Sequence, residues 1–330
     1  MGAQADAREM VNALAARARA HEAAGDRAAQ LETLANLAAL LRELGDEQGM
    51  RRALDQAYRV ALDIEGGEGI AQTLHQLGVL YHREGAWDKA LELYHWAYAV
   101  QAEAKDRMGL AMTLGSIGEA FQGKGEFQKA LEAYQESLDL KTKLQDARGL
   151  PLTWNNIGTL KAKMGDLGGA MEAFRESLRL QEGLEDARGK AATLANIGSI
   201  HQRRGNLREA LLALEQSLAH YEQAEDPPGA ANTLNALGFV RRRLGDLDGA
   251  YQSYARARDM LQASGDLLRV TVPAHNMALI HEEREEYREA LRIMEEVIAI
   301  DKRIGHPELR QDLEAFGRIR EKLDRQRDAR

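Results

Sequence analysis

The hydrophobic and small residues of this chain recur with a period of 40 positions. In the segment 111–150, Leu114, Ile117 and Phe121 are spaced three and four residues apart, and similarly spaced apolar residues follow from Phe127 onward. Such spacing places side chains on one face of an α-helix. The segment superimposes on others that start at positions 71, 151, 191 and 231. A fixed period of this length indicates an array of structural repeats.

Each repeat is predicted to contain two helices separated by a glycine. The first helix carries two large apolar residues and an internal glycine, as in Leu114, Ile117 and Gly118. Glycine inside a helix costs roughly 1 kcal/mol relative to alanine, so its recurrence predicts a close approach by another helix. A second set of glycines is expected to end the first helices in the left-handed conformation: Gly85, Gly125, Gly165, Gly205 and Gly245.

The second helices are predicted to begin at a large apolar residue two positions after these glycines, or after Glu285, which replaces the glycine in the seventh repeat. The predicted starts are Trp87, Phe127, Leu167, Leu207, Leu247 and Tyr287. An alanine three residues later, such as Ala130, and a large residue such as Tyr134 are expected to fill the space between the helices. Aspartates close the repeats as predicted N-caps of the next first helix: Asp106, Asp146, Asp186, Asp226 and Asp266.

The order of these positions resembles the tetratricopeptide repeat, with its bulky residue, Leu-Gly pair, tyrosine and small residues. The usual proline at the end of the second helix is absent, and residues such as Thr142 and Glu182 stand there. The longer unit is similar to the 40-residue branch typified by Pins-type adaptors and kinesin light chains. The resemblance implies an all-α fold: a right-handed superhelical α-solenoid of about seven helix pairs with capping helices at both ends.

We expect a single solenoid over residues 1–330, because each repeat of a solenoid contacts only its neighbours. Residues 1–25 are predicted to form an N-terminal capping helix, 26–306 the seven repeats and 307–330 a C-terminal capping helix. In the first repeat the second helix is expected to be displaced by three residues, at Ala53-Leu54, and to end early at Gly66-Gly67. The last helix is expected to bury one apolar face, made of Leu309, Leu313, Phe316 and Leu323.

The amino-acid composition of the chain argues against several classes of function. The net charge of −8 argues against nucleic acid as the main partner. The absence of cysteine excludes disulfides, a thiol nucleophile and thiolate metal ligands. The first ten residues are too polar for a secretion signal, and no apolar run approaches the roughly 18 residues of a membrane span. We therefore expect a cytoplasmic protein, and its richness in Ala, Arg and Gly favours a bacterial source.

Two segments approach chemical motifs without completing them. The segment 118–125 is similar to a phosphate-binding loop, but it lacks the Ser or Thr that would hold magnesium. In the segment 281–285 a glutamate stands where a zinc-protease helix has its second histidine. Both segments are better explained by the repeat, so we predict no enzyme, no cofactor and no metal site.

A partner is expected to bind the exposed face of the first helices. This face lies beside the apolar face, further around the helix axis. In tetratricopeptide proteins the equivalent face lines a concave groove. Asparagines recur there, and each can pair with both the N–H and the C=O of an extended peptide. Basic residues recur at its edge, although the protein is acidic overall. The predicted partner-binding residues are His75, Arg83, Asn155, Asn156, Lys163, Asn196, Arg203, Asn235, Arg242, Arg243 and Asn276.

The sequence therefore predicts a non-catalytic scaffold that binds an extended, acidic peptide segment of a partner protein. The alternative is a peptide-sensing regulatory domain of a bacterial signalling or transcription regulator. No nucleic-acid or membrane partner is expected under either interpretation.

Overall fold

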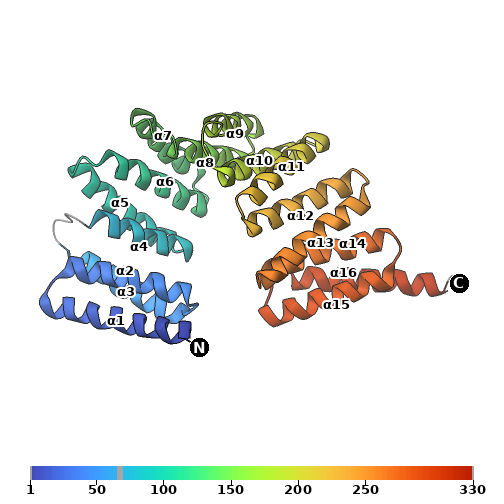
Figure 1. The fold of residues 1–330 in the computed structure, drawn as a ribbon, viewed down its shortest axis with the longest axis horizontal. Helices are drawn as coiled ribbons and strands as arrows, with labels where there is room; N and C mark the ends of the chain where they lie inside the picture. Colours follow the sequence, from blue (N-terminus) through green and yellow to red (C-terminus); the bar gives the residue numbers. More distant parts are fainter. Residues whose placement is uncertain (1, 65–69, 329–330) are drawn as a thin grey trace. The chain divides into compact units, whose positions relative to one another are not determined.

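The computed structural model describes residues 2–64 and 70–328, and every regular element in that part of the chain is an α-helix (Figure 1). Apart from the connection that contains residues 65–69, each helix is joined to the next by a short turn or connection. The helices are α1 (Gly2–Ala24), α2 (Arg27–Glu43), α3 (Glu47–Leu62), α4 (Ala71–Arg83), α5 (Trp87–Glu103), α6 (Arg107–Lys124), α7 (Phe127–Lys143), α8 (Gly149–Lys163), α9 (Leu167–Gln181), α10 (Ala187–Arg203), α11 (Leu207–Gln223), α12 (Pro227–Arg243), α13 (Leu247–Ala263), α14 (Leu267–Glu283), α15 (Tyr287–Ile304) and α16 (Leu309–Asp328).

The helices gather into two compact units, which we call the N-terminal unit (residues 1–166, α1–α8) and the C-terminal unit (residues 167–330, α9–α16). Within each unit, helices that follow one another in the sequence pack together. First helices of consecutive repeats also touch, as α4 touches α6 and α10 touches α12. The assignment of residues 1–330 to one continuous solenoid with two caps stays a prediction.

The helices begin and end where the sequence predicts. The second helices start at the six predicted residues, from Trp87 to Tyr287. The carboxylates of Asp106, Asp146 and Asp186 accept hydrogen bonds from backbone N–H groups three residues on, at 2.8–2.9 Å. These bonds satisfy donors that the helix itself leaves unpaired. The five predicted stop glycines are all left-handed, with φ between 72° and 89°.

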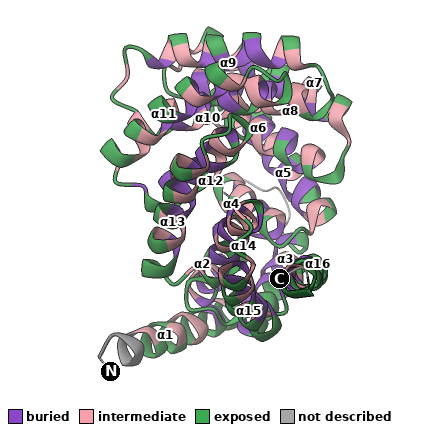
Figure 2. Cartoon of the chain, turned by 90° about the vertical axis from the view of Figure 1, so that its right-hand side faces the viewer, coloured by how far each residue is buried: buried purple, intermediate pink, exposed green. Residues whose placement is uncertain are grey.

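The internal glycines lie under large side chains of the second helix in their own repeat. A Cβ built on Gly118 would lie 2.5 Å from the Tyr134 ring, and one on Gly238 would lie 2.6 Å from the Tyr254 ring. Both rings are almost completely buried. The predicted close approach is thus confirmed, and it is made by a tyrosine ring at these two glycines and by Leu214 at Gly198. Figure 2 shows the buried positions along the helix sides that face neighbouring helices.

The first repeat keeps the register of the others, so the predicted three-residue displacement is wrong. Helix α3 begins at Glu47, 40 residues before the start of α5, and its N-cap is Asp46, where α5 has Ala86. Met50 and Leu54 stand where the next repeat has its alanine and its tyrosine, and both are buried. Methionine and leucine thus fill together the space that alanine and tyrosine fill in the next repeat. Gly66-Gly67 lies outside the described residues.

The face that α16 buries also differs from the predicted one. Its buried residues are Asp312, Ala315, Ile319 and Leu323, while Leu313 is 44% exposed. Of the predicted apolar face, Leu323 is buried and Phe316 packs against the neighbouring cluster of α13–α15. An aspartate occupies the buried end of this helix, and its partners are described below.

Replacing Gly118 with alanine is expected to destabilise the protein by about 1–3 kcal/mol, because the added methyl group overlaps the buried Tyr134 ring. Gly115→Ala is the matched control on the same helix, where a Cβ meets only the Ser137 hydroxyl, at 3.8 Å. This control is expected to stabilise by up to about 1 kcal/mol through helix propensity. Urea unfolding of both variants measures the difference, and equal effects would show that the ring does not limit the space at Gly118.

Candidate functional site

The predicted partner-binding residues all lie on first helices, and none of them is buried. They divide between α4 and α8 in the N-terminal unit and α10, α12 and α14 in the C-terminal unit. The asparagines, His75 and Arg242 are half-buried, whereas Arg83, Lys163, Arg203 and Arg243 are exposed. We call this surface of each unit its first-helix face.

Polar side chains on this face join consecutive first helices at a sequence spacing of 41 residues. Asn276 on α14 donates through Nδ2 to Oδ1 of Asn235 on α12, at 3.2 Å. His75 on α4 lies 3.0 Å from the hydroxyl of Ser116 on α6. The asparagine pair uses one donor and one acceptor. The side-chain NH₂ group of Asn235 and the side-chain carbonyl of Asn276 have no bond to another described residue, so they are available to a peptide.

In the N-terminal unit the face also carries a carboxylate. Glu119 on α6 accepts a hydrogen bond from Asn156 on α8, at 3.1 Å. Burial, and the charge of Glu119, raise the pKa values of Tyr94 and Tyr134, so both phenols stay neutral. Glu119 was not among the predicted site residues. The position holds a different residue type in each neighbouring repeat, so no recurring pattern marked it, and its partner lies 37 residues away in sequence.

The run of three arginines at the end of α12 points in three directions. Arg242 pairs with Glu283 on α14, with Nε 2.7 Å from Oε1. Arg241 turns towards α11 and α13, where it donates to a side chain of each helix at 2.9 Å. Arg243 stays exposed and stacks over the Phe239 ring at 6.0 Å. The charge of Arg242 is balanced by Glu283, so the basic character of the face on α12 depends on Arg243.

His75 has a packing role in this structure. Its ring lies 5.4 Å from the Tyr94 ring, between α4 and α6, and burial lowers its pKa. A neutral imidazole that already bonds Ser116 fits a contact between repeats. Its assignment as a partner-binding residue stays a prediction.

The segments that approach chemical motifs are ordinary parts of the repeat. Residues 118–124 lie inside α6, where Gly118 is covered by Tyr134, so they form no phosphate-binding loop. In the other segment, His281 pairs with Glu286. No group of three or more His, Asp or Glu residues in the described parts of the chain has a geometry that would hold a metal ion. None of the described helices combines the length and apolarity needed to cross a bilayer.

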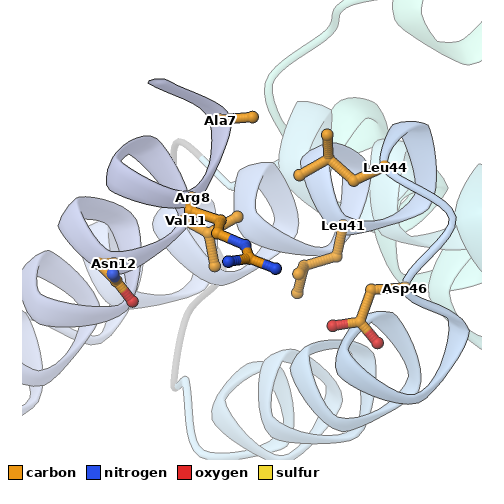
Figure 3. A pocket seen from close by; sticks show the side chains of 7 residues that line it. All are labelled: Ala7, Arg8, Val11, Asn12, Leu41, Leu44 and Asp46. Carbon is orange, nitrogen blue, oxygen red and sulfur yellow. The ribbon is translucent and has the colours of Figure 1, made fainter. Parts of the chain in front are cut away.

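A cavity of about 490 Å³ lies in the N-terminal unit between α1, the end of α2 and the start of α3. Arg8 and Asp46 point into it, beside the apolar Val11, Leu41 and Leu44 (Figure 3). The carboxylate of Asp46 also caps α3 by accepting a backbone N–H at 2.8 Å. The cavity shares no residue with the first-helix face, and the cap explains its carboxylate.

The chain belongs to the tetratricopeptide repeat family. The family model matches residues 28–103, 69–143, 150–223 and 229–303, which together cover most of the sequence. Membership in this family indicates a protein–protein interaction scaffold, and such proteins are generally non-catalytic. No curated protein matches the sequence.

Solved structures agree with this fold at low sequence identity. A Rap protein complexed with competence and sporulation factor is 15% identical, with a TM-score of 0.60, over 97% of this chain and 99% of that one. A signal-transduction ATPase with a tetratricopeptide repeat sensor from Pyrococcus horikoshii is 12% identical, with a TM-score of 0.69, over 89% of this chain and 46% of that one. BtubC from P. vanneervenii is 21% identical, with a TM-score of 0.55, over 65% and 89% of the two chains.

The Arg242–Glu283 pair is expected to contribute little to stability. Both side chains are partly exposed, at 26% and 39%, and such pairs typically contribute about 0–1 kcal/mol. A double-mutant cycle with Arg242→Ala and Glu283→Ala, followed by urea unfolding, measures the coupling. We expect at most about 1 kcal/mol, decreasing with added salt. A coupling of about 3 kcal/mol, the size expected of a buried pair, would instead identify the contact as a structural element of the array.

Proposed function

We propose that the protein is a non-catalytic scaffold whose first-helix face binds an extended, acidic peptide segment of a partner. The observation that carries this proposal is the Asn235–Asn276 pair, which leaves one amide NH₂ group and one carbonyl for a partner on neighbouring helices. An extended peptide backbone offers the complementary groups. The exposed Arg203 and Arg243, on α10 and α12, supply the charge that would attract acidic side chains.

The cellular setting is part of the same proposal. A chain without cysteine and rich in Ala, Arg and Gly fits the cytoplasm of a bacterium. The second candidate function is a peptide-sensing regulatory domain. It is supported by the likeness in fold, over nearly the whole of both chains, to the Rap protein complexed with competence and sporulation factor.

Peptide selection tests the proposed binding. A displayed library of random peptides is selected on the purified protein, and the enriched peptides are titrated by calorimetry. We expect enrichment in Asp and Glu, with affinity that falls as salt is raised. Arg203→Glu with Arg243→Glu is expected to weaken binding about tenfold or more, because hydrogen bonds to charged groups contribute roughly 1.5–3 kcal/mol each.

The matched control carries the same charge change on second helices, as Arg175→Glu with Arg208→Glu, at exposed residues of α9 and α11. It is expected to bind the selected peptides as the wild type does. Asn235→Ala with Asn276→Ala should reduce affinity for acidic and neutral peptides alike, because the amides contact the backbone. Selected peptides without acidic enrichment, or an equal loss in the control, would contradict the proposal.

A further inference from the structure

Four titratable side chains meet where the C-terminal helix α16 joins the preceding repeat. His275 comes from α14, Asp301 from the end of α15, His306 from the turn after it and Asp312 from the first turn of α16. Asp301 is fully buried, and Asp312 and His306 are exposed by only 4% and 9%. The first-helix face described above does not include these three residues. Buried carboxylates are costly unless they are paired, so this group requires an explanation.

The two aspartates differ in their contacts: Asp312 has a histidine partner, and in the described part of the chain Asp301 has only the neighbouring Asp312 carboxylate, with which it can share a proton. Asp312 forms an ion pair with Nδ1 of His275. Asp301 has no hydrogen bond at either carboxylate oxygen among the described residues. The Nδ1 atom of His306 lies 3.8 Å from Asp301, but it already accepts the Glu308 N–H at 3.2 Å. A nitrogen that accepts a hydrogen bond carries no proton, so His306 does not donate to Asp301 in this arrangement.

The charged groups that face Asp301 are mostly acidic. Asp312 approaches it from α16 and Glu308 from the turn, while His306 is the one basic group close to it among the described residues; His275 reaches the cluster through Asp312. Burial and the neighbouring Asp312 carboxylate raise the pKa of Asp301 to about 7. In mildly acidic solution the two aspartates therefore hold one proton between them, as closely spaced carboxylates do.

Beyond its first turn, helix α16 is held to the rest of the unit by two sets of contacts. Towards its middle, Ala315 and Ile319 pack into the apolar cluster of α13–α15. On the same stretch, Arg318 binds Glu282 of α14 through two hydrogen bonds, at 2.9 and 3.0 Å, and Lys322 adds a third contact. These contacts attach the middle of the helix without any aspartate.

The first turn of α16 has a different attachment. Leu309 and Leu313 are not buried, so they add little apolar contact there. Asp312 is the buried residue of this turn, and its contacts with His275 and Asp301 join the turn to α14 and α15. The docking of the start of α16 therefore depends on the charges in this cluster.

We propose that the Asp301–Asp312 pair, with His275 and His306, forms a pH-sensitive latch that holds the start of α16 against α14 and α15 when protonated and releases it as the pH rises to neutral. The latch is independent of peptide binding on the first-helix face.

The sign of the effect follows from the two states of Asp301. Its pKa is about 7 when α16 is docked, and release of α16 removes Asp312 and admits water, so the pKa falls towards its ordinary 3.8. Between these values the docked state binds more protons, so docking weakens about tenfold per pH unit from roughly pH 4 to 7 and then levels off. Glu282 acts in the opposite sense, since its bonds to Arg318 lower its pKa. Its contribution is present above about 4.5 and is lost at lower pH, so docking is strongest in mild acid.

Hydrogen exchange of the full chain tests the latch. Protection of the α16 amides is measured at pH values of about 5.5 and 7.5, corrected for intrinsic exchange, with α12 amides as the internal reference. The wild type is expected to lose protection in the first two turns of α16 by up to about 25-fold between these values, with no comparable change in α12. Protection that stays constant in the wild type would overturn the proposal.

Two variants remove the titrating group in different ways. Asp301→Asn keeps the shape, and Asp301→Leu introduces the residue that stands buried 40 positions earlier, at Leu261. Both are expected to keep α16 protected at the higher pH and to abolish the pH dependence. Asp324→Asn, at an exposed residue of α16, is the matched control and should retain the wild-type dependence. A pH dependence that persists in either folded Asp301 variant would also refute the latch.

Discussion

The contact between a small residue of the first helix and a large side chain sixteen positions later sets the geometry of the helix pairs. Gly118 lies beneath the ring of Tyr134, so the two helices approach with an aromatic ring lying on bare backbone. Where the large residue is the methionine of the seventh repeat, Met294, the small residue is an alanine, Ala278. The combined volume of the small and the large side chain is thus similar in the two repeats, as close packing requires.

The close pairing leaves the first helices with a second face that is polar and only half-buried. Under the proposed function its side chains both connect the repeats and contact a peptide. Asn235 and Asn276 tie α12 to α14, and Arg242 adds an ion pair with Glu283 across the same two helices. Groups that are held by such contacts are already ordered before a ligand arrives, so binding costs less side-chain entropy. The same residues can therefore connect repeats and recognise a peptide, and a substitution there changes both properties.

The packing at the end of the seventh repeat differs from that of the inner repeats. In the inner repeats the buried position near the end of the second helix holds Gln101, Lys141 or Leu261, whereas the seventh repeat has Asp301 there. The helix that covers it, α16, brings Asp312 into the same space. A helix in the capping role predicted for α16 is polar on its outer side and attached on its inner side. Here part of the attachment is made by ionisable groups, which links the docking of α16 to pH.

The sequence by itself determined the repeat period, the helix boundaries and the N-cap residues, because these depend on residues close together in the chain. The repeated pattern of these residues also identified the family. Gly125 ends a helix whatever the rest of the chain does. It also placed the eleven candidate residues on one face of the first helices, since helical periodicity fixes which side chains share a face. It failed at the first repeat, where Met50 helps to fill the space without matching the residue type of the later repeats.

Only the tertiary structure decided which charges are balanced, because Glu283 reaches Arg242 from a helix 41 residues away in sequence. The protonation of Asp301 was likewise beyond the sequence, since it depends on how deeply neighbouring helices bury two carboxylates in one place.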